Sequence, residues 1–358
     1  MHTYEENRNT MNKYSIIKAD IRNNQDDIFP ILIKNLQEPS SDKYVWAYIQ
    51  CPYGTAQCWL AKHEQTNTFI GTSALFPRVI LVKGEPVYAA IAGDFAVDIH
   101  HRSLIAALAL QREIQSKITD TGFRIIYGLP NKHSKGILLK IGYKKIGKFS
   151  HFIKPLKSEY KDNNHLHSLL RLKIFAGAVD ILIKGFSKEN RYKTPLKYSV
   201  ITPDHFDDRF DAFWNTVSRH FTIIGERTSV FLNWRYMESP VREYKIFCLV
   251  NEQNDIIGYI VYFLENNMCH ITDMLFEPSA EIISSLLAEF SRFMQKKGAG
   301  SISVDYLGGC LLEKKLREFN FLPINSEADL IIYSSGPVVT TDLLNKENWH
   351  FFAGDNDV

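Results

Sequence analysis

Short apolar runs separated by polar turns dominate the first hundred residues of the chain. Gln57–His63 and Thr68–Phe76 are rich in aromatic, β-branched and other apolar residues and are separated by four polar residues, a pattern typical of a β-hairpin. A second pair, Val79–Val82 and Val87–Val97, flanks a turn that contains Gly84 and Pro86. The pattern predicts two consecutive antiparallel hairpins.

The period of the pattern then changes. Apolar residues at helical spacing over Arg102–Thr121, with Gly122 immediately after them, predict a long helix. Strand Arg124–Leu129, helix Ser134–Lys140 and strand Lys144–Ile153 are expected to follow. Together with the hairpins they form one α/β unit, for which we place the boundaries at residues 1–156.

The segment 157–197 differs from its surroundings. A polar stretch leads into the amphipathic run Leu166–Phe186, and the basic stretch Lys188–Lys193 follows. An inter-domain helix and a membrane-surface helix both fit this pattern. We expect a helical linker, because a run with an acidic residue and few aromatic residues does not make a strong membrane anchor.

The order of elements in residues 198–358 repeats that of the first unit. Asp273-Met-Leu-Phe stands where Asp94-Phe-Ala-Val stood, and Phe321 stands where Tyr143 stood. The separation is 49 residues in the first unit and 48 in the second, which favours a degenerate tandem repeat of one fold. The predicted fold class is α/β with a mixed (α+β) sheet, in two domains of which the second is degenerate.

The landmarks of Asp94–Phe152 resemble the core of the GNAT (Gcn-related N-acetyltransferase) superfamily. They are Asp94-Phe95-Ala96-Val97-Asp98, His101-Arg102 at the start of the helix, Tyr127-Gly128-Leu129-Pro130-Asn131, and Ile141-Gly142-Tyr143. The resemblance implies an acyl-CoA co-substrate, acetyl-CoA by default, bound where two parallel strands separate. It implies that the pantetheine arm pairs with one of these strands and that the pyrophosphate rests on the start of the next helix.

A helix start is a suitable anion site because its first N–H groups have no partner within the helix. The residues implied to bind the cofactor are Phe95, Ala96, Val97, Arg102, Ser103, Leu104, Ile105, Ala106, Ala107 and Asn131. Ile105 departs from the family pattern, which has glycine there. Gly93, inside a strand pattern, marks either a bulge that separates the strands or a position needed only for packing.

Amine acylation needs a base for the amine and a proton for the departing thiolate. We expect Asp94 to be the base, because it follows Gly93 on the separating strand. The family's acid is a tyrosine at a position that is Leu138 here. Tyr143 and His133 are the candidates to replace it, and Tyr127 is a further one.

Composition limits the other possibilities. The net charge of +2 argues against a nucleic-acid partner. Five scattered cysteines, the absence of a signal-peptide pattern and the absence of a long apolar run favour a cytoplasmic protein without a membrane span. No metal-binding motif occurs. The helix start of the second unit carries Glu277 and Glu281 instead of arginine, so that unit is expected to bind no cofactor.

The main hypothesis is an acyl-CoA-dependent N-acyltransferase that acts by direct transfer on a small amine. By analogy the acceptor is an amino sugar or polysaccharide precursor, and a homodimer is possible. Two alternatives stay open: a Fem-like transferase that takes its acyl group from aminoacyl-tRNA, and a non-catalytic GNAT-fold protein.

Overall fold

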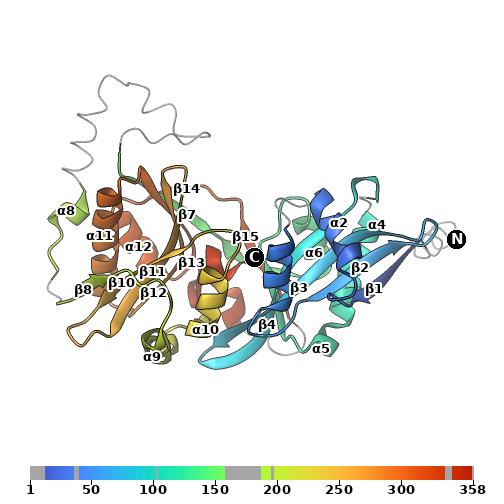
Figure 1. Cartoon of the computed structure of the whole chain (residues 1–358), viewed down its shortest axis with the longest axis horizontal. Coiled ribbons are helices and arrows are strands. Elements are labelled where there is room, and N and C mark those ends of the chain that lie inside the picture. Colours follow the sequence, from blue (N-terminus) through green and yellow to red (C-terminus); the bar gives the residue numbers. More distant parts are fainter. Residues whose placement is uncertain are drawn as a thin grey trace, which may run out of the picture.

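The protein consists of two α/β halves that lie side by side along its long axis (Figure 1). This computed structural model describes residues 13–35, 40–101, 104–157, 187–194, 197–334 and 341–356. Strands from both halves join into one mixed sheet of 16 strands within these residues. The sheet is therefore shared between the halves.

The first half contains antiparallel strands followed by a helix-connected α/β segment. Its elements are β1 (Tyr14–Ala19), α2 (Gln25–Asn35), α3 (Ser41–Tyr44), the π-helix η1 (Val45–Ile49), β2 (Gln57–His63), β3 (Thr68–Val82), β4 (Glu85–Val97), η2 (Ile99–His101), α4 (Leu104–Ser116), α5 (Ile118–Thr121), β5 (Ile125–Gly128), α6 (Lys135–Lys140), β6 (Lys144–Lys148) and β7 (Ser150–Pro155).

The second half follows a similar order. Its elements are α8 (Lys188–Arg191), β8 (Ser199–Ile201), α9 (Asp208–Val217), η4 (Ser218–His220), β9 (Ile223–Gly225), α10 (Ser229–Leu232), the π-helix η5 (Asn233–Met237), β10 (Lys245–Val250), β11 (Ile256–Glu265), β12 (Met268–Phe276), α11 (Ala280–Lys297), β13 (Ser301–Gly308), α12 (Cys310–Glu318), β14 (Leu322–Ile324), β15 (Asp329–Ser334), η7 (Thr341–Leu344), η8 (Lys346–Asn348), β16 (Trp349–Phe352) and η9 (Ala353–Asp355).

Strand pairing confirms that the two halves repeat one topology. In the first half β1, β2, β3 and β4 pair antiparallel in turn, and β4 pairs parallel with β5. In the second half β8, β10, β11 and β12 do the same, and β12 pairs parallel with β13. Each parallel pair is connected through a helix, α4 or α11, as a parallel crossover requires.

The halves exchange a strand. β7 of the first half pairs with β13 and β14 of the second, and β15 of the second half pairs with β5 and β6 of the first. Each half is thus completed by a strand from the other half of the sequence.

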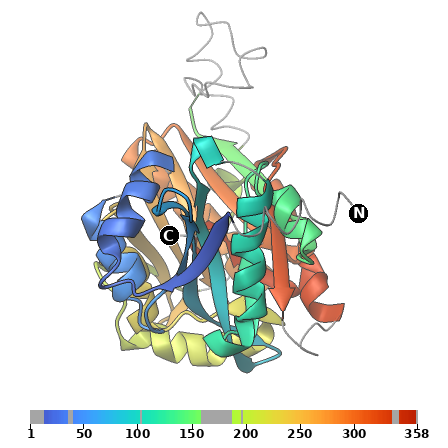
Figure 2. The ribbon, with the colours of Figure 1, turned by 90° about the vertical axis from the view of Figure 1, so that its right-hand side faces the viewer.

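Helices cover both faces of the sheet in the first half (Figure 2). Side chains on a strand alternate between faces, and on β4 the buried residues Ala89 and Ile91 join one core cluster while Ala90 joins another. The first cluster includes residues of α2 and η1, and the second includes Leu110 and Ile114 of α4. The sheet is a central layer between two helical layers.

Two tryptophans from equivalent π-helices form one of the contacts between the halves. The indole rings of Trp46 in η1 and Trp234 in η5 stack with centroids 5.1 Å apart. Trp46 Nε1 donates to the Trp234 carbonyl at 2.8 Å, and Trp234 Nε1 donates to the Trp46 carbonyl at 3.2 Å. The reciprocal bonds place the two halves in an approximately two-fold relation.

The predicted hairpin of Gln57–His63 with the strand that begins at Thr68 is confirmed. The two runs predicted separately, Thr68–Phe76 and Val79–Val82, form the single strand β3. The helix expected over Arg102–Thr121 is shorter: α4 ends at Ser116, and α5 forms a separate turn. Residues 102 and 103, with which this helix was expected to begin, lie outside the described residues. The expected linker helix Leu166–Phe186 also lies outside them. In the part of the chain that the structure describes, no helix combines the length and the apolar character needed to cross a membrane.

Candidate active site

The parallel strands β4 and β5 separate shortly after they begin to pair. Their register covers Ala89–Ile91 against Ile125–Tyr127 and goes no further. At the next position Gly128 lies against Ala92, and a Cβ at residue 128 would come within 3.0 Å of the Ala92 carbonyl oxygen. Glycine therefore permits the last close approach before the strands diverge.

A bulge accompanies this separation. Ala74 of β3 pairs with Gly93, but Thr72 pairs with Ala96, so Asp94 and Phe95 lie opposite a single residue. Asp94 adopts a φ of 48°, in the left-handed region that a non-glycine residue rarely occupies. Of the two interpretations of Gly93, a bulge or a packing position, the bulge is present, and it begins one residue later at Asp94.

A cavity of about 150 Å³ lies where the strands separate. The end of β4, the segment after β5, helices α4 and α6, and β15 from the second half supply its walls. The lining residues are Ser73, Ala92, Gly93, Asp94, Phe95, Gln111, Gly128, Leu129, Pro130, Asn131, Ser134, Leu138, Tyr143 and Ile331. The slot expected between two parallel strands is thus open in the first half.

Asp94 places a carboxylate in the wall of this cavity. Its Oδ2 accepts a hydrogen bond of 2.6 Å from the Tyr48 hydroxyl, and no described residue forms a salt bridge with it. The side chain is half-buried. Burial raises the pKa of Asp94, while the hydrogen bond from Tyr48 and the charge of Lys43 oppose this rise. A carboxylate with a raised pKa is a stronger base than a solvent-exposed one.

Tyr143 contributes a hydroxyl from the opposite face of the sheet. The residue is buried and lines the cavity, and its hydroxyl has no hydrogen-bond partner among the described residues. Burial raises the pKa of Tyr143, with a smaller effect from Tyr333, so the phenol keeps its proton at neutral pH. Because an unpaired buried hydroxyl is costly, this group is suited to a partner that enters the cavity.

The turn after β5 is organised by Asn131. Its Oδ1 accepts hydrogen bonds from the backbone N–H groups of His133 at 2.9 Å and Ser134 at 3.0 Å, which orders the turn that leads into α6. Asn131 also lines the cavity, whereas His133 is exposed and does not. The structure therefore brings Asp94, Tyr143 and Asn131 together and leaves His133 outside.

The remaining expected cofactor residues follow the strand and enter the helix. Phe95 lines the cavity, while Ala96 and Val97 are buried and pair with Thr72 and Gly71 of β3. Ala106 and Ala107 are buried, Ile105 is 38% exposed, α4 begins at Leu104, and Arg102 and Ser103 lie outside the described residues.

Three further residues belong to the site and were not expected. Tyr48 binds Asp94, and Gln111 Nε2 donates to Ser73 Oγ at 2.9 Å inside the cavity wall. A signal for Tyr48 exists in the sequence: Trp46-Ala47-Tyr48 repeats the Trp-x-Tyr pattern of Trp234-Arg235-Tyr236.

The second half has the same strand separation, but a strand of its own chain pairs along the edge that β12 leaves free. β12 pairs with β13 only as far as Ile271 and Val304. Beyond that point β16 takes the same edge of β13, because β7 occupies the other edge. In the first half, among the described residues, no strand takes the corresponding edge of β5. The first slot is open and the second is closed by the C-terminal segment.

Charged residues complete this closure. Arg227 binds Asp273 through Nε and Nη2 at 2.9–3.1 Å, and its Nη2 also donates to Asp355 at 2.6 Å. Arg78 of β3 donates to the other oxygen of Asp355 at 3.1 Å. All four side chains are buried. Asp273 is thus neutralised by arginine, whereas its first-half counterpart Asp94 is bound by a tyrosine.

The described residues contain no group of three or more histidine, cysteine, aspartate or glutamate side chains arranged to hold a metal ion. No family model and no curated protein sequence matches the chain. Solved structures do match it over most of its length.

A conserved Enterococcus faecalis V583 protein of unknown function, described as a probable N-acyltransferase, superposes with a TM-score of 0.65 at 12% identity, covering 90% of this chain and 72% of that one. A GCN5-related N-acetyltransferase from Anabaena variabilis gives 0.61 at 13% identity, covering 89% and 72%. Saccharomyces cerevisiae N-myristoyltransferase with bound myristoyl-CoA gives 0.56 at 11% identity, covering 94% and 84%.

The chain has a tandem GNAT fold. At these identities the likeness concerns the fold, and the activity rests on the residues of the site.

Proposed function

We propose that the protein is an acyl-CoA-dependent N-acyltransferase whose reaction takes place in the first half. The observation that carries the proposal is the open slot between β4 and β5, which has Asp94 and the unpaired Tyr143 hydroxyl in its wall. In the second half β16 occupies the corresponding edge of β13, which supports a proposal in which only the first half binds the acyl donor.

The size of the cavity favours a short acyl group. A cavity of about 150 Å³ is comparable to one that binds a single benzene molecule. That volume suits an acetyl group together with the end of the pantetheine arm. It is too small for the end of the arm together with a long alkyl chain. Acetyl-CoA is therefore the proposed donor.

The side chains on the two walls divide the proton transfers between them. Asp94 accepts a proton from the acceptor amine as the nitrogen attacks the thioester carbonyl carbon, directly or through one water. The new C–N bond forms as the C–S bond breaks, and the Tyr143 hydroxyl gives its proton to the departing thiolate. Backbone N–H groups of Phe95–Val97 are the proposed donors to the carbonyl oxygen.

The helix start and the turn after β5 are the proposed contacts for the rest of the cofactor. Arg102 and the backbone of residues 103–107 supply positive charge and N–H groups for the pyrophosphate. Asn131 lies at the cavity wall, where it keeps the turn ordered and can contact the pantetheine. The acceptor is proposed to be a small amine, such as an amino sugar.

The test combines binding and turnover. Isothermal titration with acetyl-CoA, butyryl-CoA and myristoyl-CoA measures affinity, and release of free thiol over a library of amines measures acyl transfer. We expect acetyl-CoA to bind most tightly. Asp94→Asn and Tyr143→Phe should each lower kcat by about 10²–10⁴-fold with little change in acetyl-CoA affinity.

Two matched variants serve as controls. Tyr259 is another buried tyrosine whose hydroxyl has no partner in the described chain, and it lies in the second half. Asp120 is an exposed aspartate on α5. Tyr259→Phe and Asp120→Asn should leave turnover unchanged. No binding of any acyl-CoA at millimolar concentration would refute the proposal, as would full activity of Asp94→Asn.

A further inference from the structure

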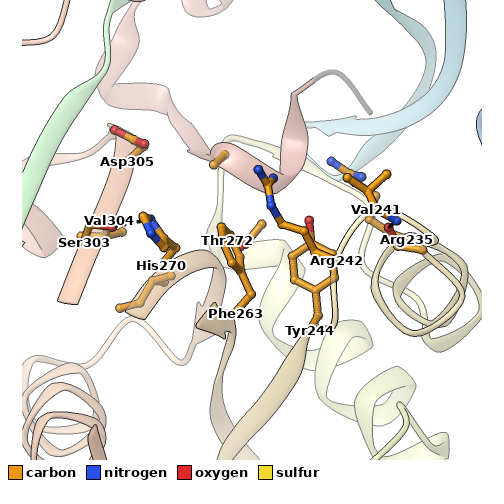
Figure 3. A pocket seen from close by; sticks show the side chains of 13 residues that line it. Arg235, Val241, Arg242, Tyr244, Phe263, His270, Thr272, Ser303, Val304 and Asp305 are labelled. Carbon is orange, nitrogen blue, oxygen red and sulfur yellow. Dashed lines mark hydrogen bonds between the residues drawn. The ribbon is translucent and has the colours of Figure 1, made fainter. Parts of the chain in front are cut away.

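A second cavity lies in the second half, beside the point where β12 and β13 separate (Figure 3). Its volume is about 200 Å³. The walls come from β11, β12 and β13, from η5 with the segment after it, and from η9. Its lining shares no residue with the cavity of the first half. The acyl-CoA slot therefore does not account for it.

Arg242 places a fixed positive charge in this wall. Its guanidinium carbon lies 4.6 Å from the centre of the Phe263 ring, and the ring of His270 stacks on Phe263 at 4.7 Å with an interplanar angle of 11°. Arg242 is exposed and forms no salt bridge with a described residue. The aromatic stack orients the guanidinium while its N–H donors stay available to a ligand.

Arg235 adds a second positive charge at the same end of the cavity, as Figure 3 shows. The side chain is buried, and its Nε donates to the Gly354 carbonyl at 3.2 Å. Two positive charges on one side of a small cavity favour an oxyanion such as a carboxylate or a phosphate, and the Arg242 guanidinium presents N–H donors in a fixed plane.

Buried hydroxyl groups line the space next to the arginines. Thr272 is 5% exposed, and its Oγ1 has no hydrogen-bond partner among the described residues. Ser303 is also buried, and its Oγ lies 2.9 Å from His270 Nδ1. A buried hydroxyl without a partner is costly, so Thr272 Oγ1 indicates a ligand atom that the cavity is built to accept.

The one acidic side chain in the lining lies apart from the arginines. Asp305 is at the opposite end in Figure 3, and its Oδ1 is 2.7 Å from His151 Nδ1. An anion held by Arg242 therefore lies at the end of the cavity away from this carboxylate, where their repulsion is weaker.

We propose that this cavity binds a small molecule through a carboxylate or phosphate group, held by Arg242 and Arg235 and by the Thr272 hydroxyl. The shared chemistry is an oxyanion on a compact body, which a volume of about 200 Å³ suits. The inference goes beyond the acyltransferase reaction and does not depend on it.

The test is isothermal titration of the full chain with four probes: succinate, glutamate, inorganic phosphate and glucosamine 6-phosphate. The first two present carboxylates and the last two present phosphate, so the tighter pair identifies the group. We expect saturable binding by one pair, weakened at least about 10-fold by Arg242→Ala and by the isosteric Thr272→Val.

Arg219→Ala is the matched control. Arg219 is another exposed arginine of the second half, outside the cavity lining, and it donates to the Asn215 carbonyl. It should leave affinity unchanged. The proposal is overturned if none of the probes binds at concentrations up to about 50 mM. It is also overturned if binding is unchanged in Arg242→Ala and Thr272→Val. Circular dichroism of both variants separates a lost site from a lost fold.

Discussion

Replacing Asp355 with asparagine tests whether the closed second slot stabilises the whole chain. The Asp355 carboxylate accepts hydrogen bonds from Arg227 Nη2 at 2.6 Å, Arg78 Nη2 at 3.1 Å and the Phe352 N–H at 3.1 Å. Asp355→Asn keeps the size of the side chain but removes its charge. It also places an amide donor against a guanidinium donor.

The expected loss of stability follows from burial. Arg78, Arg227, Asp273 and Asp355 are each 3% exposed or less, and their formal charges cancel. Removing one carboxylate leaves a net positive charge out of contact with water. Breaking a buried ion pair in this way costs about 3–5 kcal/mol. Urea denaturation followed by tryptophan fluorescence measures the change in the free energy of unfolding.

A solvent-exposed ion pair provides the control. Glu243 and Lys245 lie 3.2 Å apart, with side chains 83% and 47% exposed, and Glu243→Gln should cost less than about 1 kcal/mol. The reasoning is refuted if Asp355→Asn costs no more than Glu243→Gln.

The same carboxylate gives a pH dependence. Burial alone would raise the pKa of Asp355, but the charges of Arg227 and Arg78 hold it below its ordinary value of 3.8. A group whose pKa is lowered by folding stabilises the native state above its unfolded pKa and loses this effect as pH falls through the folded pKa. The difference in stability between the wild type and Asp355→Asn should therefore be full at pH 6 and shrink below about pH 4.

Three further predictions concern the site and the contact between halves. The Tyr48 hydrogen bond opposes the raised pKa of Asp94. Tyr48→Phe should therefore raise this pKa further and move the rising limb of the kcat/KM–pH profile to higher pH. A limb that does not move would argue against Asp94 as the base. Tyr143→Phe removes a hydroxyl that has no described partner, so its thermal midpoint should stay within about 2 °C of the wild type while turnover falls; parallel loss of both would mean a structural role. Trp46→Ala removes a buried ring and the bond to the Trp234 carbonyl, and should cost about 3–5 kcal/mol in chemical denaturation; a cost below 1 kcal/mol would show that the halves do not depend on this contact.

Local patterns predicted much of the fold because they reflect local physics. The hairpin of β2 and β3 follows from apolar strands around a polar turn, and the repeat follows from equal spacing of Asp94 and Tyr143 with Asp273 and Phe321. The short helix α3 and the π-helix η1 before β2 were not predicted, because runs of four or five residues are too short to show a helical period.

The features that distinguish the two halves depend on distant parts of the chain. The strand exchange of β7 and β15, and the insertion of β16 beside β13, involve pairings that no local pattern encodes. Asp94 was a candidate base because it follows Gly93, but its partner Tyr48 is 46 residues away. Tyr143 was one of several candidates, and only its place in the cavity wall separates it from His133.

The second half is needed for the first half's site even though its own slot is closed. β15 pairs with β5 on the edge away from β4, and Ile331 of β15 lines the cavity. Tyr333 of the same strand packs against the Tyr143 ring, with centroids 5.4 Å apart. A wall of the proposed catalytic cavity and the neighbour of its proposed acid thus come from the second half. The second half thus supports the first-half cavity through β15. This support does not depend on the strand separation in the second half, so the C-terminal strand β16 can occupy that edge while the first-half cavity stays intact.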